Sequence, residues 1–160
     1  MDAKDIVIVG VALGGWLFAG FKEWLAYRER KVTRMEDRLF SSLSWFEGKT
    51  QKRSIGIAVI EGLWPDLEEY RKILIPLLAN QAIYLLAVSN EDTDHERNNL
   101  QRIMRLILAY NLLNSEFSHL HCELLELTSR TTNRRGSLGN SVSKNDLESW
   151  NNMLSNSVIK

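Results

Sequence analysis

The side chains best suited to chemistry in this sequence gather between residues 119 and 123. His119, His121, Cys122 and Glu123 are all possible metal ligands, and His119 and Glu123 stand one helical turn apart. A zinc site needs four ligands, or three and a water molecule, and usually takes a second pair from elsewhere in the chain. The only other histidine is His95, and there is no second cysteine. We therefore expect no metal ion and no cofactor, and interpret this cluster as packing residues.

The sequence Gly48-Lys49-Thr50 has the form of the last part of a phosphate-binding loop. The full pattern requires a glycine five residues before Gly48, where this chain has Leu43, and a preceding strand, which the sequence does not predict. A connection between two helices is the better interpretation. No nucleophile, base and orienting group form a recognisable set either. We therefore expect that the protein is not an enzyme.

The elements around these residues are predicted to be helical, beginning with an uncharged run of sixteen residues from Ile6 to Phe21. A helix needs about 20 apolar residues to cross a bilayer. Counting on to Tyr27 reaches that length if Lys22 and Glu23 extend their charged ends to the headgroups. Trp24 and Tyr27 would then lie in the interfacial region. We predict a transmembrane anchor at 1–27.

Two other interpretations of the same run are a cleaved signal peptide and a buried helix of a soluble domain. The first five residues carry no positive excess, which argues against a signal peptide. Basic residues follow the run and should stay in the cytoplasm; they are Lys22, Arg28, Arg30, Lys31 and Arg34. This predicts a single-pass protein of the inner (plasma) membrane, with the N-terminus outside and the C-terminal domain cytoplasmic. The single Cys122 suits a reducing compartment.

Small residues along the predicted anchor suggest self-association. Gly10 and Gly14 form a G-x-x-x-G pair, and Gly15 and Ala19 repeat the spacing. Small residues one turn apart allow two helix backbones to approach closely in lipid. We predict a homo-oligomer, whose anchors could line an apolar pore.

The predicted fold class is all-α, with the transmembrane helix continuing into a cytoplasmic stalk and then an antiparallel helical bundle. The stalk is expected at 28–47, because no Pro or Gly interrupts it and apolar residues recur at three- and four-residue steps. The bundle is expected at 48–130. A Ser-, Asn- and Gly-rich stretch at 131–144 is typical of a flexible linker. A short helix at 145–160 carries Trp150 on an apolar side that needs a partner.

Within the bundle we expect three helices. The first covers about Ser54 to Leu63. The second begins near Pro65, ends near Ser89 and is interrupted by Pro76. Its broad apolar face predicts a core or a subunit interface; the face comprises Ile73, Leu77, Asn80, Ile83, Tyr84 and Ala87, and is widened by Ile75, Leu78, Leu85 and Leu86.

The third predicted helix, from Asp94 to about Arg130, carries a heptad pattern. Aromatic residues at one heptad position fit a two-stranded coil poorly, so we favour core packing, with a self-association seam as the alternative. The pattern comprises Ile103, Leu106, Tyr110, Leu113, Phe117, Leu120, Leu124 and Leu127.

The layout, with Gly10, Gly14 and Gly15 in one N-terminal anchor, a basic stalk and a helical body, resembles the small single-pass effector subunits of bacterial anti-phage defence systems, including the Hailong type. The resemblance is one of architecture and extends over the whole chain. It implies a homo-oligomeric ion channel gated by a nucleotide or oligonucleotide from a partner enzyme. The implied phosphate contacts are Lys49, Lys52, Arg53, Arg71, Lys72, Arg134 and Arg135. Twenty basic and twenty acidic residues give no general attraction to duplex DNA.

Two functions therefore remain open. One is an oligomeric membrane effector, an ion channel or membrane-disrupting pore. The other is a membrane-anchored adaptor whose helical domain docks another protein through the Ile73–Ala87 face or the Trp150 helix.

Overall fold

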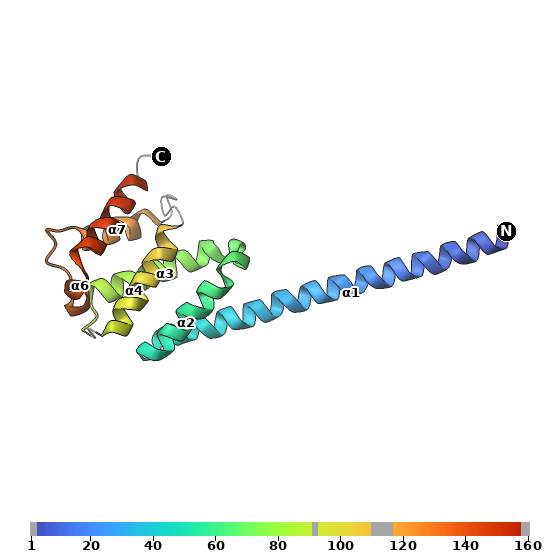
Figure 1. Ribbon diagram of the computed structural model, residues 1–160, viewed down its shortest axis with the longest axis horizontal. Helices are drawn as coiled ribbons and strands as arrows, with labels where there is room; N and C mark the ends of the chain where they lie inside the picture. Colours follow the sequence, from blue (N-terminus) through green and yellow to red (C-terminus); the bar gives the residue numbers. More distant parts are fainter. Residues whose placement is uncertain (1–2, 91–92, 110–116, 158–160) are drawn as a thin grey trace. The chain divides into compact units, whose positions relative to one another are not determined.

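A computed structural model describes residues 3–90, 93–109 and 117–157, with their side chains from Phe21 onward except that of Glu47. The regular elements within these residues are α-helices and 3-10 helices, and none is a strand (Figure 1). This confirms the predicted all-α fold. The α-helices are α1 (Ala3–Ser44), α2 (Thr50–Leu63), α3 (Arg71–Ala87), α4 (Asp94–Leu108), α5 (Ser118–Thr128), α6 (Ser137–Ser141) and α7 (Lys144–Ser157). The chain forms two compact units, Met1–Ser41 and Ser42–Lys160.

The first unit consists of α1, which extends three residues into the second unit. No Pro or Gly lies between Phe21 and Glu47, so nothing in that stretch interrupts the backbone hydrogen bonds. The rings of Phe21 and Trp24 stack with centroids 5.9 Å apart, and the Arg28 guanidinium lies 5.9 Å from the Trp24 ring centroid. Spacings of three and four residues therefore stabilise this helix locally.

The predicted membrane location is corrected by the structure. In the described part of the chain, no helix combines the length and the apolar character that crossing a membrane requires. The uncharged run from Ile6 to Phe21 has sixteen residues, short of the roughly 20 needed, and Lys22 and Glu23 follow it directly. The single-pass topology and the inner-membrane location predicted from this run are therefore wrong. Gly10, Gly14, Gly15 and Ala19 lie on α1, but their side chains are outside the described ones.

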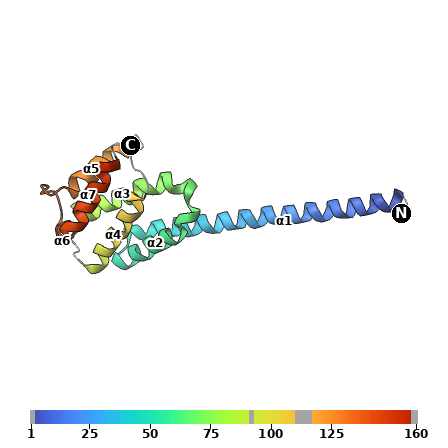
Figure 2. The ribbon, with the colours of Figure 1, turned by 45° about the horizontal axis from the view of Figure 1, so that its top comes forward.

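The second unit is a helical bundle built around α3. This helix packs against α4, α5 and α6, while α2 packs on α4 and α7 packs on both α4 and α5 (Figure 2). Each of these helices contributes buried apolar side chains to one core. They include Ile57 and Ile60 of α2, Leu74 and Leu78 of α3, Leu100 and Ile107 of α4, Leu124 of α5, Leu138 of α6 and Leu154 of α7.

The heptad pattern extends over two helices, so the predicted single helix from Asp94 to Arg130 is wrong. Helix α4 ends at Leu108, with Ala109 as its cap, and α5 begins at Ser118. Both helices turn their apolar positions toward the core, as expected for intramolecular packing. Ile103, Leu106, Leu120, Leu124 and Leu127 are buried, Phe117 is half-buried, and Tyr110 and Leu113 lie outside the described residues.

The stretch predicted as a flexible linker, 131–144, contains α6 and is bonded to the end of α3. The backbone N–H of Gly136 donates to the Leu86 carbonyl at 2.9 Å, and that of Leu138 donates to the Ser89 carbonyl at 3.2 Å. A Cβ atom at Gly139 would lie 2.2 Å from the Leu86 carbonyl oxygen, so only glycine allows this approach. Helix α7 follows, and its Leu147, Trp150 and Leu154 are buried. The body of the domain is therefore the partner that the Trp150 face needed.

The start of α3 also differs from the prediction. Two 3-10 turns, Trp64–Asp66 and Glu68–Tyr70, come first, and α3 then runs unbroken through Pro76. Pro76 is the sixth residue of α3, so it removes one backbone donor from inside the helix, and the helix continues past it.

Candidate docking surface on helix α3

Helix α3 is apolar on every side. The eighteen residues from Ile73 to Asn90 contain no charged side chain. One face of the helix forms the centre of the core, with Leu74, Ile75, Leu78, Ala79, Ala82, Leu85 and Leu86 all at 1% exposure or less. Helices that are apolar all round are normally covered all round.

The other face of α3 lies on the surface, and we call Ile73, Leu77, Asn80, Tyr84 and Val88 the α3 stripe. Its apolar members are large and open: Ile73 is 64% exposed, Leu77 46%, Tyr84 45% and Val88 59%. Asn80 is also exposed. At 3.6 residues per turn the five positions lie within an arc of about 80°.

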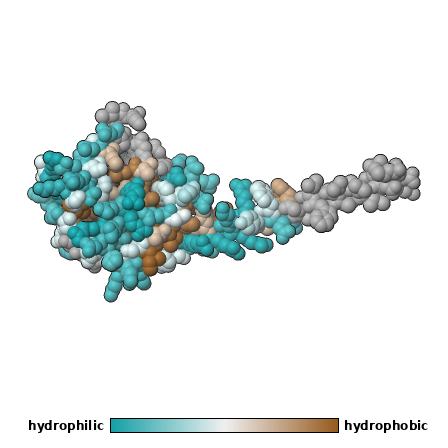
Figure 3. Space-filling model, in the orientation of Figure 1, coloured by the Kyte–Doolittle hydropathy of each residue, from teal (hydrophilic) through white to brown (hydrophobic). Residues whose placement is uncertain are grey.

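Four of the five stripe residues belong to the face predicted from the sequence, whereas Val88 does not, and Ile75, Leu78, Leu85 and Leu86 of that face are buried in the core. Ile73, Leu77, Asn80 and Tyr84 are exposed, whereas Ile83 and Ala87 are half-buried. The view in Figure 3 shows a body surface that is mostly hydrophilic, with hydrophobic residues confined to small patches. Single exposed apolar residues are normal, but a contiguous row of them marks an interaction site.

The spacing of the stripe is symmetric along the helix. Its apolar positions follow steps of four, seven and four residues, so Ile73 and Leu77 mirror Val88 and Tyr84 about a point between Asn80 and Gln81. Reversing the direction of the helix therefore reproduces the same spacing of apolar positions, with Ile73 exchanged for Val88 and Leu77 for Tyr84. Such a row can pair with a second copy of itself across a two-fold axis.

Both ends of α3 are held by polar contacts. At the start, Arg71 donates from Nη2 to the Trp64 carbonyl at 3.2 Å, and its guanidinium lies 5.4 Å from the Trp64 ring centroid. At the end, the Gly136 amide donates to the Leu86 carbonyl, which the helix terminus leaves open, and the Leu138 amide donates to the carbonyl of Ser89 just beyond the helix. The stripe is thus presented by a fixed helix.

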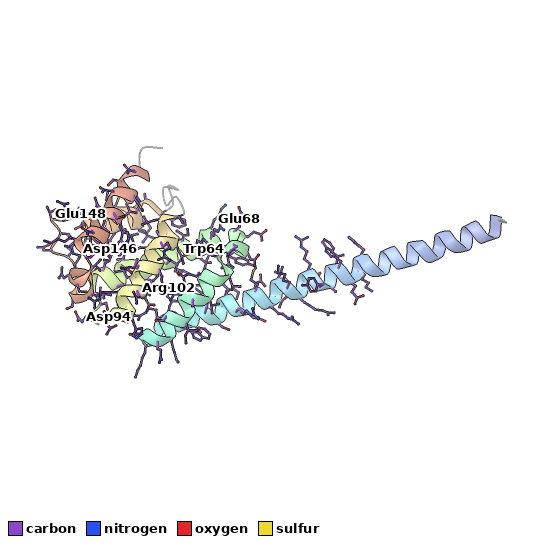
Figure 4. The ribbon with its side chains drawn as sticks, in the orientation of Figure 1. Trp64, Glu68, Asp94, Arg102, Asp146 and Glu148 are labelled. Carbon is purple, nitrogen blue, oxygen red and sulfur yellow. The ribbon has the colours of Figure 1, made fainter. Side chains whose placement is uncertain are left out.

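A second polar feature, which the sequence did not reveal, joins α2 to α4. Arg53 of α2 forms an ion pair with the fully buried Glu96 of α4, and Ser54 donates to Asn99 at 3.0 Å. Beside them, Arg102 donates from Nε to Glu61 at 2.8 Å (Figure 4 labels Arg102). The sequence Thr93-x-x-Glu96 is a helix-start signature, and Thr93 does accept from the Glu96 amide. Nothing local, however, indicates that Glu96 pairs with a residue 43 positions earlier.

His121 is the one member of the possible metal cluster that is buried, at 3% exposure. Within the described residues neither of its ring nitrogens has a hydrogen-bond partner, and burial lowers its pKa below the usual 6.5. No three His, Cys, Asp or Glu side chains come together to hold a metal ion in the described ranges. We therefore interpret His121 as a neutral residue that packs in the core.

The basic residues implied as phosphate contacts belong to three separate segments, 49–53, 71–72 and 134–135. Among the described contacts, none links a basic residue of one segment to another of these segments. Lys49, Lys52 and Lys72 are exposed. Arg53 and Arg71 make the contacts given above. Arg134 pairs with Glu126 at 2.8 Å, and Arg135 donates from Nη1 to the carbonyls of Leu127 and Ser129, at the end of α5.

Comparison of the chain with protein-family models, with curated proteins and with solved structures found no match.

Proposed function

We propose that this protein acts by binding rather than by catalysis, as a self-associating helical adaptor whose copies pair through the α3 stripe. The observation that carries the proposal is the exposed, uncharged row of apolar side chains with symmetric spacing on α3. The partner is a second copy of the chain.

The spacing defines how two copies would meet. In an antiparallel pair, Ile73 lies opposite the partner's Val88, and Leu77 lies opposite the partner's Tyr84. Asn80 then lies next to the two-fold axis and faces the partner's Asn80. Two amide side chains can donate to and accept from each other, and a single polar pair within an apolar seam fixes the register.

The size of the stripe sets the expected affinity. Stable interfaces bury about 800 Å² per partner, and one face of a single helix provides less. No charged side chain lies between Ile73 and Asn90, so like charges do not oppose the approach. We therefore expect a weak, reversible dimer whose population depends on protein concentration.

Pairing of the bodies would place two α1 helices in one particle. Helix α1 itself exposes Phe21, Trp24 and Tyr27, at 57%, 54% and 67%. Aromatic side chains of this kind are frequent anchors in protein interfaces. Two copies of such a helix would bind a divalent target more tightly than one, because the second contact is intramolecular.

The predicted ion channel is not carried forward. Among the described residues no helix is long and apolar enough to cross a membrane, so the membrane part of that prediction is not proposed again. The second function left open by the sequence was a membrane-anchored adaptor; the present proposal keeps from it only docking through the Ile73–Ala87 face.

The test is the mass of the full-length protein by light scattering across a concentration series. Wild type should approach twice the monomer mass of 18.4 kDa as its concentration rises. Leu77→Glu should remain monomeric, because a charge would be buried in the seam. Ile55→Glu is the matched control: Ile55 is 50% exposed on α2 and should leave the dimer unchanged. A mass unaffected by Leu77→Glu would reject the proposal.

A further inference from the structure

A small depression lies where α7 meets the connection between α5 and α6, and we call it the α7 pocket. Its volume is about 220 Å³, and it is lined by Arg130, Arg135, Lys144, Leu147 and Glu148. A second depression of about 340 Å³ shares Arg130 and Glu148 and is otherwise lined by Thr128, Ser129, Asn151 and Asn152. Figure 4 shows Glu148 on the side of the body away from Trp64 and Glu68, which precede α3.

The α7 pocket carries an excess of positive charge. Arg130 and Arg135 come from the connection between α5 and α6, Lys144 is the first residue of α7, and the carboxylate of Glu148 lines the same pocket. Lys144 is exposed and has no charged partner among the described residues. Arg135 uses Nη1 and Nε in internal hydrogen bonds, and its Nη2 has no described partner.

The single carboxylate is held by an exposed ion pair. Arg130 Nη2 lies 2.5 Å from Glu148 Oε1, and the Arg130 side chain is 75% exposed. Exposed pairs of this kind stabilise a protein little, so a stronger anion can replace Glu148 at small cost. Both members of the pair line the α7 pocket and the second depression.

We propose that the α7 pocket binds the phosphate group of a small phosphate monoester. Guanidinium groups with parallel donors match a phosphate, which accepts from several donors at once. Lys144 is the first residue of a fourteen-residue helix, where the helix dipole also favours an anion. The α7 pocket is smaller than the roughly 300–1,000 Å³ of most ligand sites. It therefore suits the phosphate group, while Ser129 and Asn152 in the second depression suit the polar remainder.

This site is independent of the α3 pairing, since it uses none of the stripe residues. It also gives different roles to Arg134 and Arg135, both of which were predicted from the sequence as phosphate contacts. Arg135 lines the α7 pocket, whereas Arg134 pairs with Glu123 and Glu126 and does not line it. Arg134 is thus a control one residue away.

The test is calorimetric titration of the full-length protein with glycerol phosphate and, separately, with inorganic phosphate, at low ionic strength. Saturable binding of glycerol phosphate is expected, tighter than that of inorganic phosphate. Lys144→Gln and Arg130→Gln should each weaken it about five- to tenfold through loss of a charge-assisted hydrogen bond. Arg134→Gln should leave it unchanged.

Glu148→Gln provides a change of the opposite sign. Removing the competing carboxylate should tighten binding of glycerol phosphate, while thermal unfolding shows that the fold is kept. The proposal is overturned if wild type shows no saturable binding, or if Arg134→Gln weakens binding as much as Lys144→Gln does. Equal affinity for both probes would reject the role of the second depression.

Discussion

Helices α3 and α4 pack against each other in the same core and present opposite kinds of surface. The outward residues of α4 are Asp94, Asn98, Gln101 and Arg105, which are all exposed. The same spacing of four, three and four residues on α3 gives Ile73, Leu77, Asn80 and Tyr84. The exposed face of α4 is therefore polar and suited to contact with water, whereas the exposed face of α3 is apolar and uncovered.

The difference between the two helices shows that the exposed fraction of each side chain distinguishes a core residue from a docking residue. The apolar character of the helix does not. Leu77 and Leu78 are neighbours of the same type, yet Leu78 is 1% exposed and Leu77 is 46% exposed. Sequence periodicity cannot assign these roles on α3, because nearly every position is apolar.

The largest expected effect comes from this pair of leucines. Leu78→Ala should lower the free energy of unfolding by about 2–5 kcal/mol, since it leaves a cavity in the core. Leu77→Ala should change it by less than about 0.5 kcal/mol at concentrations where the protein is monomeric. Urea unfolding of both variants measures the difference. Equal losses would mean that Leu77 is covered within the monomer.

A smaller effect is expected from pH, which should change the stability of the second unit but not the dimerisation through α3. Burial lowers the pKa of His121, so below pH 6.5 the unfolded chain binds a proton that the folded chain does not. Stability should be full above pH 6.5 and fall as the pH drops below it. The uncharged stripe should pair equally well over the same range.

Thermal unfolding from pH 7.5 to 5.5 tests this sign. His121→Leu should show a smaller decrease in melting temperature than wild type, and His119→Gln, at an exposed position, should behave like wild type. An identical decrease in His121→Leu would assign the acid sensitivity to other groups.

The sequence predicted the helical class, the broad apolar character of α3, the apolar face of α7, and the burial of five of the eight heptad positions. These features are local, since each depends on residues within a few turns of one another. The end of α4 at Leu108 was missed because an apolar repeat can continue across two helices that face one core. The ordered α6 segment was missed because its contacts with Leu86 and Ser89 lie about fifty residues away in sequence.

The same difference between local and long-range features applies to the candidate sites. Four of the five members of the α3 stripe were on the predicted face because they lie on one helix, but the sequence could not tell which of its apolar residues are exposed. Arg130 and Lys144 were not singled out, because they meet only when α7 packs beside α5. The membrane prediction failed where a sixteen-residue apolar run was extended through charged residues.

The most direct test of the central claim is a disulfide across the proposed two-fold axis. In a Cys122→Ser background, Asn80→Cys places one thiol per copy beside the axis, where facing helices bring Cα atoms within the 4.4–6.8 Å that a disulfide requires. Asn98→Cys, exposed on α4, is the control. We predict a covalent dimer on mild oxidation for Asn80→Cys and none for Asn98→Cys. Monomers from both, or dimers from both at equal rates, would contradict antiparallel pairing through α3.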